Sequence, residues 1–165
     1  ENAALFNFLN ANGIRSMQQL HEKISGLNTL YYDLRGEIVK AERRIAILTE
    51  RSEMWKQYSQ YKAIRKQLDK VKPAKRELFE QRHSRELLLY EAAARYLKEL
   101  KESGEEITPK AWEREISKLT AAKDVKYMDM RAMREELKAV ERLKKAADRL
   151  ARQEQEQTKD RGPER

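Results

Sequence analysis

The side chains with the clearest chemical potential are the aromatic and basic ones of residues 56–85. This segment carries ten basic residues against three acidic ones, a net charge of +7 in thirty residues, in a chain of 165 residues whose total is +8. Tyr58 and Tyr61 lie among the lysines and arginines. Aromatic faces stack on unpaired bases while cations contact phosphates, so the pattern is typical of a protein surface that binds single-stranded nucleic acid. The predicted contact residues are Lys56, Tyr58, Tyr61, Lys62, Arg65, Lys66, Lys70, Lys72, Lys75 and Arg76.

The same residues have a plainer interpretation. Trp55, Tyr58 and Tyr61 could form the core of a small helical subdomain, and the basic residues could simply keep the surface soluble. The identity of the polyanion also stays open, because the residues do not distinguish contact with DNA from contact with RNA or an acidic protein.

Catalytic and metal-binding patterns do not emerge from the residue types. His21 and His83 fall on separate predicted elements, and His21 lacks a second histidine at the spacing of zinc proteases. The chain has no cysteine, no glycine-rich phosphate loop, and no nucleophile with a credible base. Paired acids such as Glu105–Glu106 and Glu135–Glu136 fit solvated helix surfaces. We therefore expect that this chain is not an enzyme and that it holds no metal or cofactor.

A long helix predicted over residues 16–71 must position the basic segment. Ser16 and Gln19 form a capping box at its start, and Gly26 and Gly36 fall outside its apolar face. Apolar residues alternate in steps of three and four, which is typical of a helix that lies along another helix. The seam is Met17, Leu20, Ile24, Leu27, Tyr31, Leu34, Ile38, Ala41, Ile45, Leu48, Ser52 and Trp55, with Ser52 as its polar member.

A second long helix is predicted over residues 108–157, with Thr108 as N-cap and Pro109 at the first helical position. Lys123 and Lys126 interrupt its apolar seam, and the cluster of Met128, Met130 and Met133 is predicted to be core. The remaining seam residues are Trp112, Ile116, Leu119, Leu137, Val140, Ala147 and Ala151. Two long helices joined by residues 72–107 favour an all-α fold, an elongated, coiled-coil-like antiparallel hairpin with a small helical head at the bend.

The hairpin makes specific predictions about neighbours. Trp55 should lie near Trp112 at the head, where the basic segment also maps, and Leu20 should lie near Leu150 at the base. Within residues 72–107, Ser84 is a candidate cap for a helix that is apolar on more than one side and should be sandwiched.

The ends of the chain complete the predicted organisation. A short helix within residues 1–14, ending at Gly13, should pack an apolar face on the base of the hairpin. That face consists of Leu5, Phe6, Phe8 and Leu9. Residues 158–165 are predicted to be a disordered tail. Because the chain begins with Glu1, we expect a fragment of a longer protein.

Composition supports long helices in a cytoplasmic setting. Charged residues make up 39% of the chain and apolar residues another 39%, a balance typical of coiled coils. The absence of cysteine fits the cytosol. No uncharged apolar run is long enough for a membrane span, so we expect no membrane insertion.

Taken in order, these features resemble the region after the nuclease domain in relaxases, the mobilisation nucleases of Gram-positive conjugative elements. The similarity covers nearly the whole chain with few length changes. It is carried by Leu5 to Ile14, Lys40 to Ile45, Tyr58-Ser59, Phe79 to His83, Leu87 to Leu100, and Met130 to Leu137.

The resemblance implies a role in DNA transfer in a bacterial cytoplasm. Relaxases nick one DNA strand at an origin of transfer and stay linked to it through a tyrosine of a metal-dependent nuclease domain. None of those motifs can be placed here, so no catalytic residue is carried over. The chain would be a non-catalytic accessory domain that handles single-stranded or origin-of-transfer DNA, or contacts relaxosome, coupling or transfer-channel partners.

A second hypothesis needs no nucleic acid. Exposed coiled coil and the two seam lysines, which could leave a gap for another helix, are compatible with a protein-interaction or self-association module. A parallel dimer of extended chains is a further alternative, although the similar helix lengths argue against it.

Overall fold

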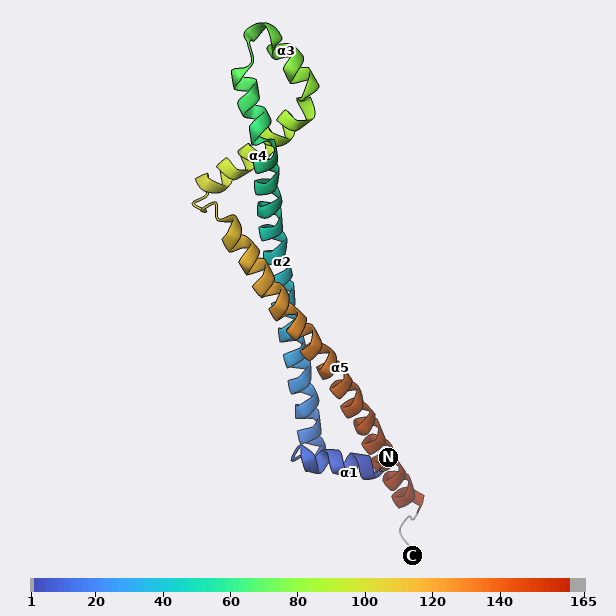
Figure 1. Cartoon of the computed structure of the whole chain (residues 1–165). Helices are drawn as coiled ribbons and strands as arrows, with labels where there is room; N and C mark the ends of the chain where they lie inside the picture. Colours follow the sequence, from blue (N-terminus) through green and yellow to red (C-terminus); the bar gives the residue numbers. More distant parts are fainter. Residues whose placement is uncertain (1, 161–165) are drawn as a thin grey trace, which may run out of the picture. The chain divides into compact units, whose positions relative to one another are not determined.

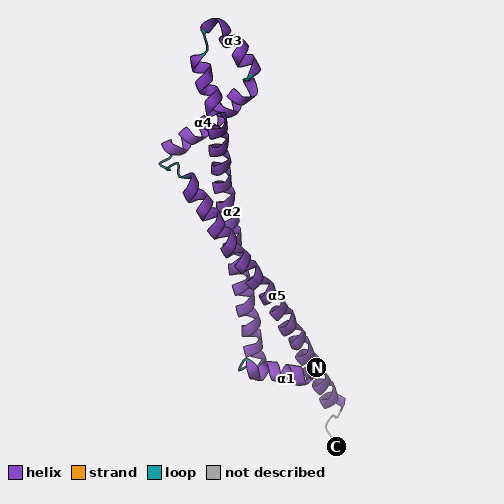
Figure 2. Ribbon diagram, viewed as in Figure 1, coloured by secondary structure: helices purple, strands orange, loops and turns teal. Residues whose placement is uncertain are grey.

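The structure, a computed structural model, describes residues 2–160, and nearly all of them are helical (Figures 1 and 2). No strand occurs in this range, so the predicted all-α class is confirmed. The helices are α1 (Asn2–Ala11), α2 (Met17–Lys70), α3 (Pro73–Arg82), α4 (Ser84–Glu102) and α5 (Pro109–Asp160). Helix α5 therefore continues through residues 158–160 of the predicted tail, and residues 161–165 lie outside the described range.

The chain forms two compact units, and both long helices contribute to each. Unit 1 comprises residues 1–39 and 124–165, and unit 2 comprises residues 40–123. Unit 1 thus contains α1 with parts of α2 and α5, whereas unit 2 contains α3 and α4 with the remaining parts.

Local signals set the start of α2. Gly13 has φ +65°, a left-handed conformation that suits glycine after the end of α1. The amide of Gln19 donates to Ser16 Oγ (3.2 Å), and the amide of Arg15 donates to Gln19 Oε1 (2.5 Å). The predicted capping box is present, with its return bond at Arg15, one residue before the cap.

In unit 1 the facing segments of α2 and α5 run antiparallel. Lys23 pairs with Glu136 (3.7 Å), Arg134 Nη2 donates to the Tyr31 hydroxyl (2.7 Å), and Glu37 pairs with Lys126 (3.5 Å). Residue numbers thus rise along α2 as they fall along α5. Lys126, one of the two seam lysines, is accommodated by its carboxylate partner on the facing helix.

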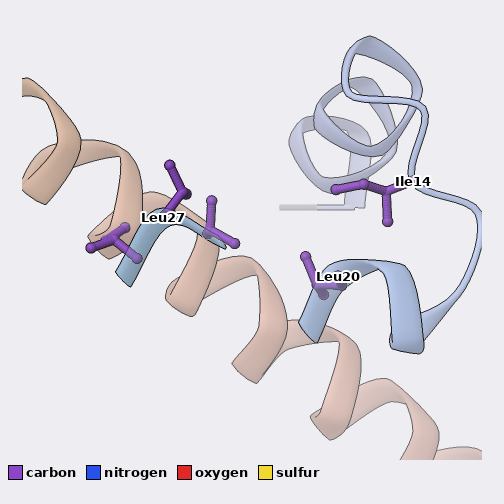
Figure 3. Packing of buried hydrophobic residues seen from close by; sticks show 5 residues of the cluster. Ile14, Leu20 and Leu27 are labelled. Atoms are coloured by element: carbon purple, nitrogen blue, oxygen red, sulfur yellow. The ribbon is translucent and has the colours of Figure 1, made fainter. Parts of the chain in front are cut away.

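The unit 1 core lies between these segments and the loop before α2. Figure 3 shows Ile14 of that loop next to Leu20, with Leu27 further along α2 and α5 alongside. Leu20 and Val140 are 1% and 0% exposed. The full cluster is Ile14, Leu20, Leu27, Leu137 and Val140.

The predicted pairing of Leu20 with Leu150 is wrong. Leu20 packs in the cluster that holds Leu137 and Val140, earlier on α5, while Leu150 is 37% exposed. The prediction aligned the two helices end to end. The observed register follows the buried apolar residues instead, because their removal from water contributes more than matched helix ends.

Two residues that were predicted to contribute to the cores, Met128 and Phe6, are exposed instead. Met128 is 69% exposed, although Met130 and Met133 are half-buried. At about 100° per residue, Met128 and Met130 point to opposite sides of the helix, so they cannot share the seam.

In α1, Leu9 packs on the unit 1 core as predicted, but Phe6 is 64% exposed. The predicted face was too wide for a helix that contacts the core along one line. The side chains of Leu5 and Phe8 lie outside the described part of the structure.

The unit 2 core joins three helices. Leu48 of α2, Leu97 of α4 and Trp112 of α5 form the buried cluster, and Trp55 packs against it. The predicted proximity of Trp55 and Trp112 is therefore confirmed. The segments of α2 and α5 again run antiparallel. Arg44 pairs with Glu115 of α5 (3.0 Å), and Arg51, further along α2, pairs with Glu105 in the loop that leads into α5 (3.6 Å).

Helix α4 is only partly enclosed. Leu87, Ala93 and Leu97 are buried, but Leu88 is 67% exposed, so the predicted sandwich covers one side of the helix. Ser84 is the first helical residue and not the cap. His83 occupies the N-cap position, because its amide donates to Phe79 O while its own carbonyl accepts from the Leu87 amide.

Candidate nucleic-acid interface

The predicted contact residues all belong to unit 2. Those from Lys56 to Lys70 are on α2, Lys72 is the N-cap residue of α3, and Lys75 and Arg76 are on α3 itself. Arg65, Tyr58 and Tyr61 are half-buried, and the other predicted residues are exposed. The two helices thus present the cations to solvent, within reach of a large anion.

Few of these cations are neutralised. Arg65 pairs with Asp69 (3.8 Å) and Arg76 with Glu80 (3.4 Å), both one turn away on the same helix. Among the described residues, no carboxylate lies within ion-pair distance of the other basic side chains of residues 56–85. These are Lys56, Lys62, Lys66, Lys70, Lys72, Lys75, Arg82 and Arg85.

Three aromatic rings from α2 and α4 form a stack beside the basic segment. The Trp55 and Tyr58 ring centroids are 5.8 Å apart at 29°, and those of Tyr58 and Tyr90 are 5.2 Å apart at 24°. Trp55 and Tyr58 also pack against the buried cluster. The core interpretation is therefore correct for one side of these two rings. Tyr61 is half-buried and is not part of the stack.

A polar contact holds α4 against α2 next to the stack. The side-chain amide of Gln57 donates to the Leu89 carbonyl (2.6 Å). Leu97, further along α4, is buried in the unit 2 core. These anchors flank Tyr90 and fix it opposite Tyr58.

A pocket of about 480 Å³ opens along the aromatic stack, and we call it the aromatic pocket. Lys62 Nζ is 5.7 Å from the centroid of the Tyr58 ring. Among the residues that the structure describes, no acidic side chain lines the pocket. Its walls are Trp55, Tyr58, Lys62, Tyr90, Ala94, Leu97, Lys98, Lys101 and Ile107.

Sequence reasoning missed the α4 side of this pocket. Tyr90, Lys98 and Lys101 were not among the predicted contact residues. The sequence does show an aromatic residue followed by lysines on one predicted helix. That pattern does not indicate that Tyr90 faces Tyr58. Only the packing of α4 on α2 brings the two tyrosines together.

The titration of the tyrosines favours neutral rings. Burial raises the pKa of Tyr90, and the neighbouring Tyr58 hydroxyl raises it further. Burial likewise raises the pKa of Tyr96. Because a phenol ordinarily titrates near 10, both rings stay uncharged at neutral pH and add no repulsion toward an anion.

The histidines do not come together. His21 is exposed on α2, and His83, between α3 and α4, packs its ring 4.5 Å from that of Phe79. In the described range, no three His, Asp or Glu side chains are arranged to hold a metal ion.

Between residues 2 and 160, no helix has the length and apolar character needed to cross a bilayer. Comparison of the chain with protein-family models, curated proteins and solved structures gives no match.

Proposed function

We propose that this chain is a non-catalytic helical module that contacts DNA through the basic segment of unit 2, residues 56–85. The observation that carries the proposal is the set of exposed lysines and arginines on α2, α3 and the start of α4, most of which have no carboxylate partner among the described residues. Unpaired lysines and arginines concentrated on one segment release counterions from a phosphate backbone when they bind it.

The biological setting of the proposal comes from the sequence resemblance. In a conjugative relaxase, such a module would handle the transferred strand, or contact relaxosome or channel partners, beside a separate nicking domain. Mobilisation of a plasmid or transposon needs single-stranded DNA to be held after nicking. An exposed basic surface next to stacked aromatic rings suits that task.

The proposal is tested by titrating a fluorescent single-stranded oligonucleotide with the whole chain at about 50 and 200 mM salt. Binding should weaken by roughly tenfold or more at the higher salt if several phosphates are contacted. Replacing Lys62, Arg65 and Lys66 with Glu should abolish binding while circular dichroism remains helical. Absence of binding at the lower salt concentration, or an affinity that does not change with salt concentration, contradicts the proposal.

A matched variant controls for total charge. Arg35, Lys118 and Arg131 are exposed and lie outside the basic segment. Their replacement with Glu changes the net charge by the same amount. Binding should be reduced far less than in the Lys62/Arg65/Lys66 variant, because short-range phosphate contacts are left in place.

A second candidate function, self-association, is favoured by apolar residues exposed on α5. Val125 is 57% exposed and Met128 is 69% exposed, one turn apart on the same helix. Such a pair lies on one side of a helix and can join two copies. Sedimentation equilibrium should then show a dimer that V125E/M128E dissociates. A stable dimer without DNA affinity would favour this candidate over the first.

A further inference from the structure

We propose that the aromatic pocket binds one unpaired nucleobase together with its phosphate, so that the module prefers single-stranded over duplex DNA. This inference rests on the proposed function and names the chemical form of the nucleic acid. It draws on side chains of α4 that lie outside the basic segment, namely Tyr90, Lys98 and Lys101.

The aromatic stack defines where the base would lie. Neighbouring rings are nearly parallel, at 29° and 24°, but their centroids are more than 5 Å apart. Such separations mean offset stacking, which leaves part of each ring face uncovered toward the pocket. Tyr58 already has two stacked ring neighbours, whereas Trp55 and Tyr90 have one each in this stack, so these two are the rings on which a further planar group can stack.

The phosphate would be held by three lysines. Lys62 approaches the pocket from α2, and Lys98 and Lys101 approach from one side of α4. None of the three forms an ion pair within the described residues. Their ammonium groups therefore remain available for an anionic ligand, and the described residues of the pocket wall include no carboxylate that would repel it.

The pocket has room for a nucleotide. Its volume of about 480 Å³ lies within the range of sites that take small organic ligands. It combines apolar walls, from Ala94, Leu97 and Ile107, with cations at its edge. A base inside a duplex is stacked and paired on its own neighbours, so it reaches such a pocket only when it is unpaired.

Trp55 provides a direct readout. The chain has two tryptophans, and Trp112 is only 4% exposed, so a ligand that stacks in the pocket should quench Trp55 selectively. The whole chain is titrated with thymidine 5′-monophosphate, with thymidine as the probe without phosphate and deoxyribose 5-phosphate as the probe without a base. We expect saturable quenching by the monophosphate, weaker quenching by thymidine, and none by the sugar phosphate.

Variants separate the pocket from the rest of the surface. K98Q/K101Q should weaken monophosphate binding by about tenfold or more, because two charged contacts are lost. K118Q/K145Q removes the same charge from exposed positions outside the pocket and should leave affinity unchanged. Y90L removes one ring of the stack and should also weaken monophosphate binding. W55F should remove the fluorescence response. Helical circular dichroism confirms that each variant is folded.

The outcomes for the pocket and for the proposed function are distinguishable. If the monophosphate does not quench Trp55 while salt-dependent oligonucleotide binding persists, the pocket inference is overturned and the DNA-contact proposal survives. If the monophosphate binds through Lys98 and Lys101 but no oligonucleotide does, the DNA-contact proposal fails. Equal binding of deoxyribose 5-phosphate, or equal competition by a duplex of the same sequence, also overturns the inference.

Discussion

Arg44 and Glu115 join α2 to α5 in unit 2 through two parallel hydrogen bonds. Arg44 Nε donates to Glu115 Oε1 (3.0 Å), and Nη2 donates to Oε2 (3.2 Å). This two-point geometry orients the side chains more strictly than a single ion pair does. The contact specifies which residues of the two long helices face each other in this unit.

The first prediction concerns the pH dependence of this contact. The hydrogen bonds from Arg44 hold the pKa of Glu115 below its ordinary value of 4.5. The contribution is therefore fully present above about pH 4.5 and is lost as the pH falls through the lower, folded-state value. Both side chains are 41% exposed, so solvent limits the effect to about 0.2–1 kcal/mol.

Urea unfolding of the Glu115→Gln variant checks this prediction. Its unfolding free energy should be below that of the natural chain at pH 7, and the difference should shrink as the pH is lowered toward 3. Glu113→Gln, an exposed carboxylate on the same helix, is the matched control. A Glu115→Gln difference that grows on acidification would contradict the assignment.

The second prediction uses the glycines of α2. Gly26 and Gly36 are exposed helical residues, and an added Cβ meets nothing within 4 Å at either position. Each change to alanine should raise the free energy of unfolding by about 0.5–1 kcal/mol. Gly13→Ala should lower it instead, because φ at that residue is +65°. Thermal unfolding of the three variants measures both signs, and stabilisation by Gly13→Ala would refute the left-handed turn.

The third prediction distinguishes the two cores. Leu20 in unit 1 and Leu48 in unit 2 are 1% and 0% exposed, whereas Leu88 is 67% exposed. Truncation of either buried leucine to alanine should cost about 2–5 kcal/mol, and Leu88→Ala should change stability by less than about 0.5 kcal/mol.

Hydrogen exchange should locate each loss in its own unit. Leu20→Ala should speed exchange around Ile14 and Leu27, its neighbours in the unit 1 core. Leu48→Ala should speed exchange in α4, which packs Leu97 against it. Identical exchange patterns in the two variants would mean that the cores do not open separately.

The fourth prediction tests the antiparallel pairing with a zero-length carbodiimide cross-linker, which joins amines to nearby carboxylates. Lys23 should link to Glu136 and Lys126 to Glu37, because these groups lie 3.7 and 3.5 Å apart. A mixture of ¹⁴N- and ¹⁵N-labelled chains distinguishes links within one chain from links between chains. Mixed-isotope products at these pairs would mean that α2 packs against α5 of a second copy, whereas a parallel dimer of extended chains would form neither link.

Local sequence was enough to predict most of the helical structure. The alternating seam of α2 correctly indicated that Leu20, Leu27, Ile38 and Leu48 are buried. Gly13, Ser16 and Pro109 marked helix ends that the structure retains. These features depend on side-chain periodicity and on hydrogen bonds between residues a few positions apart, so they are readable without the fold. Trp55 and Trp112 were also correctly placed together.

Tertiary packing decided the register and the candidate site. Leu20 meets the cluster around Val140 and not Leu150, because facing side chains on two helices settle on the alignment that buries the most apolar surface. Tyr90, Lys98 and Lys101 join Tyr58 and Lys62 only because α4 folds back on α2. The sequence by itself determined that the cations exist and lie on helices. Which aromatic rings stand beside them follows from contacts between residues that are distant along the chain.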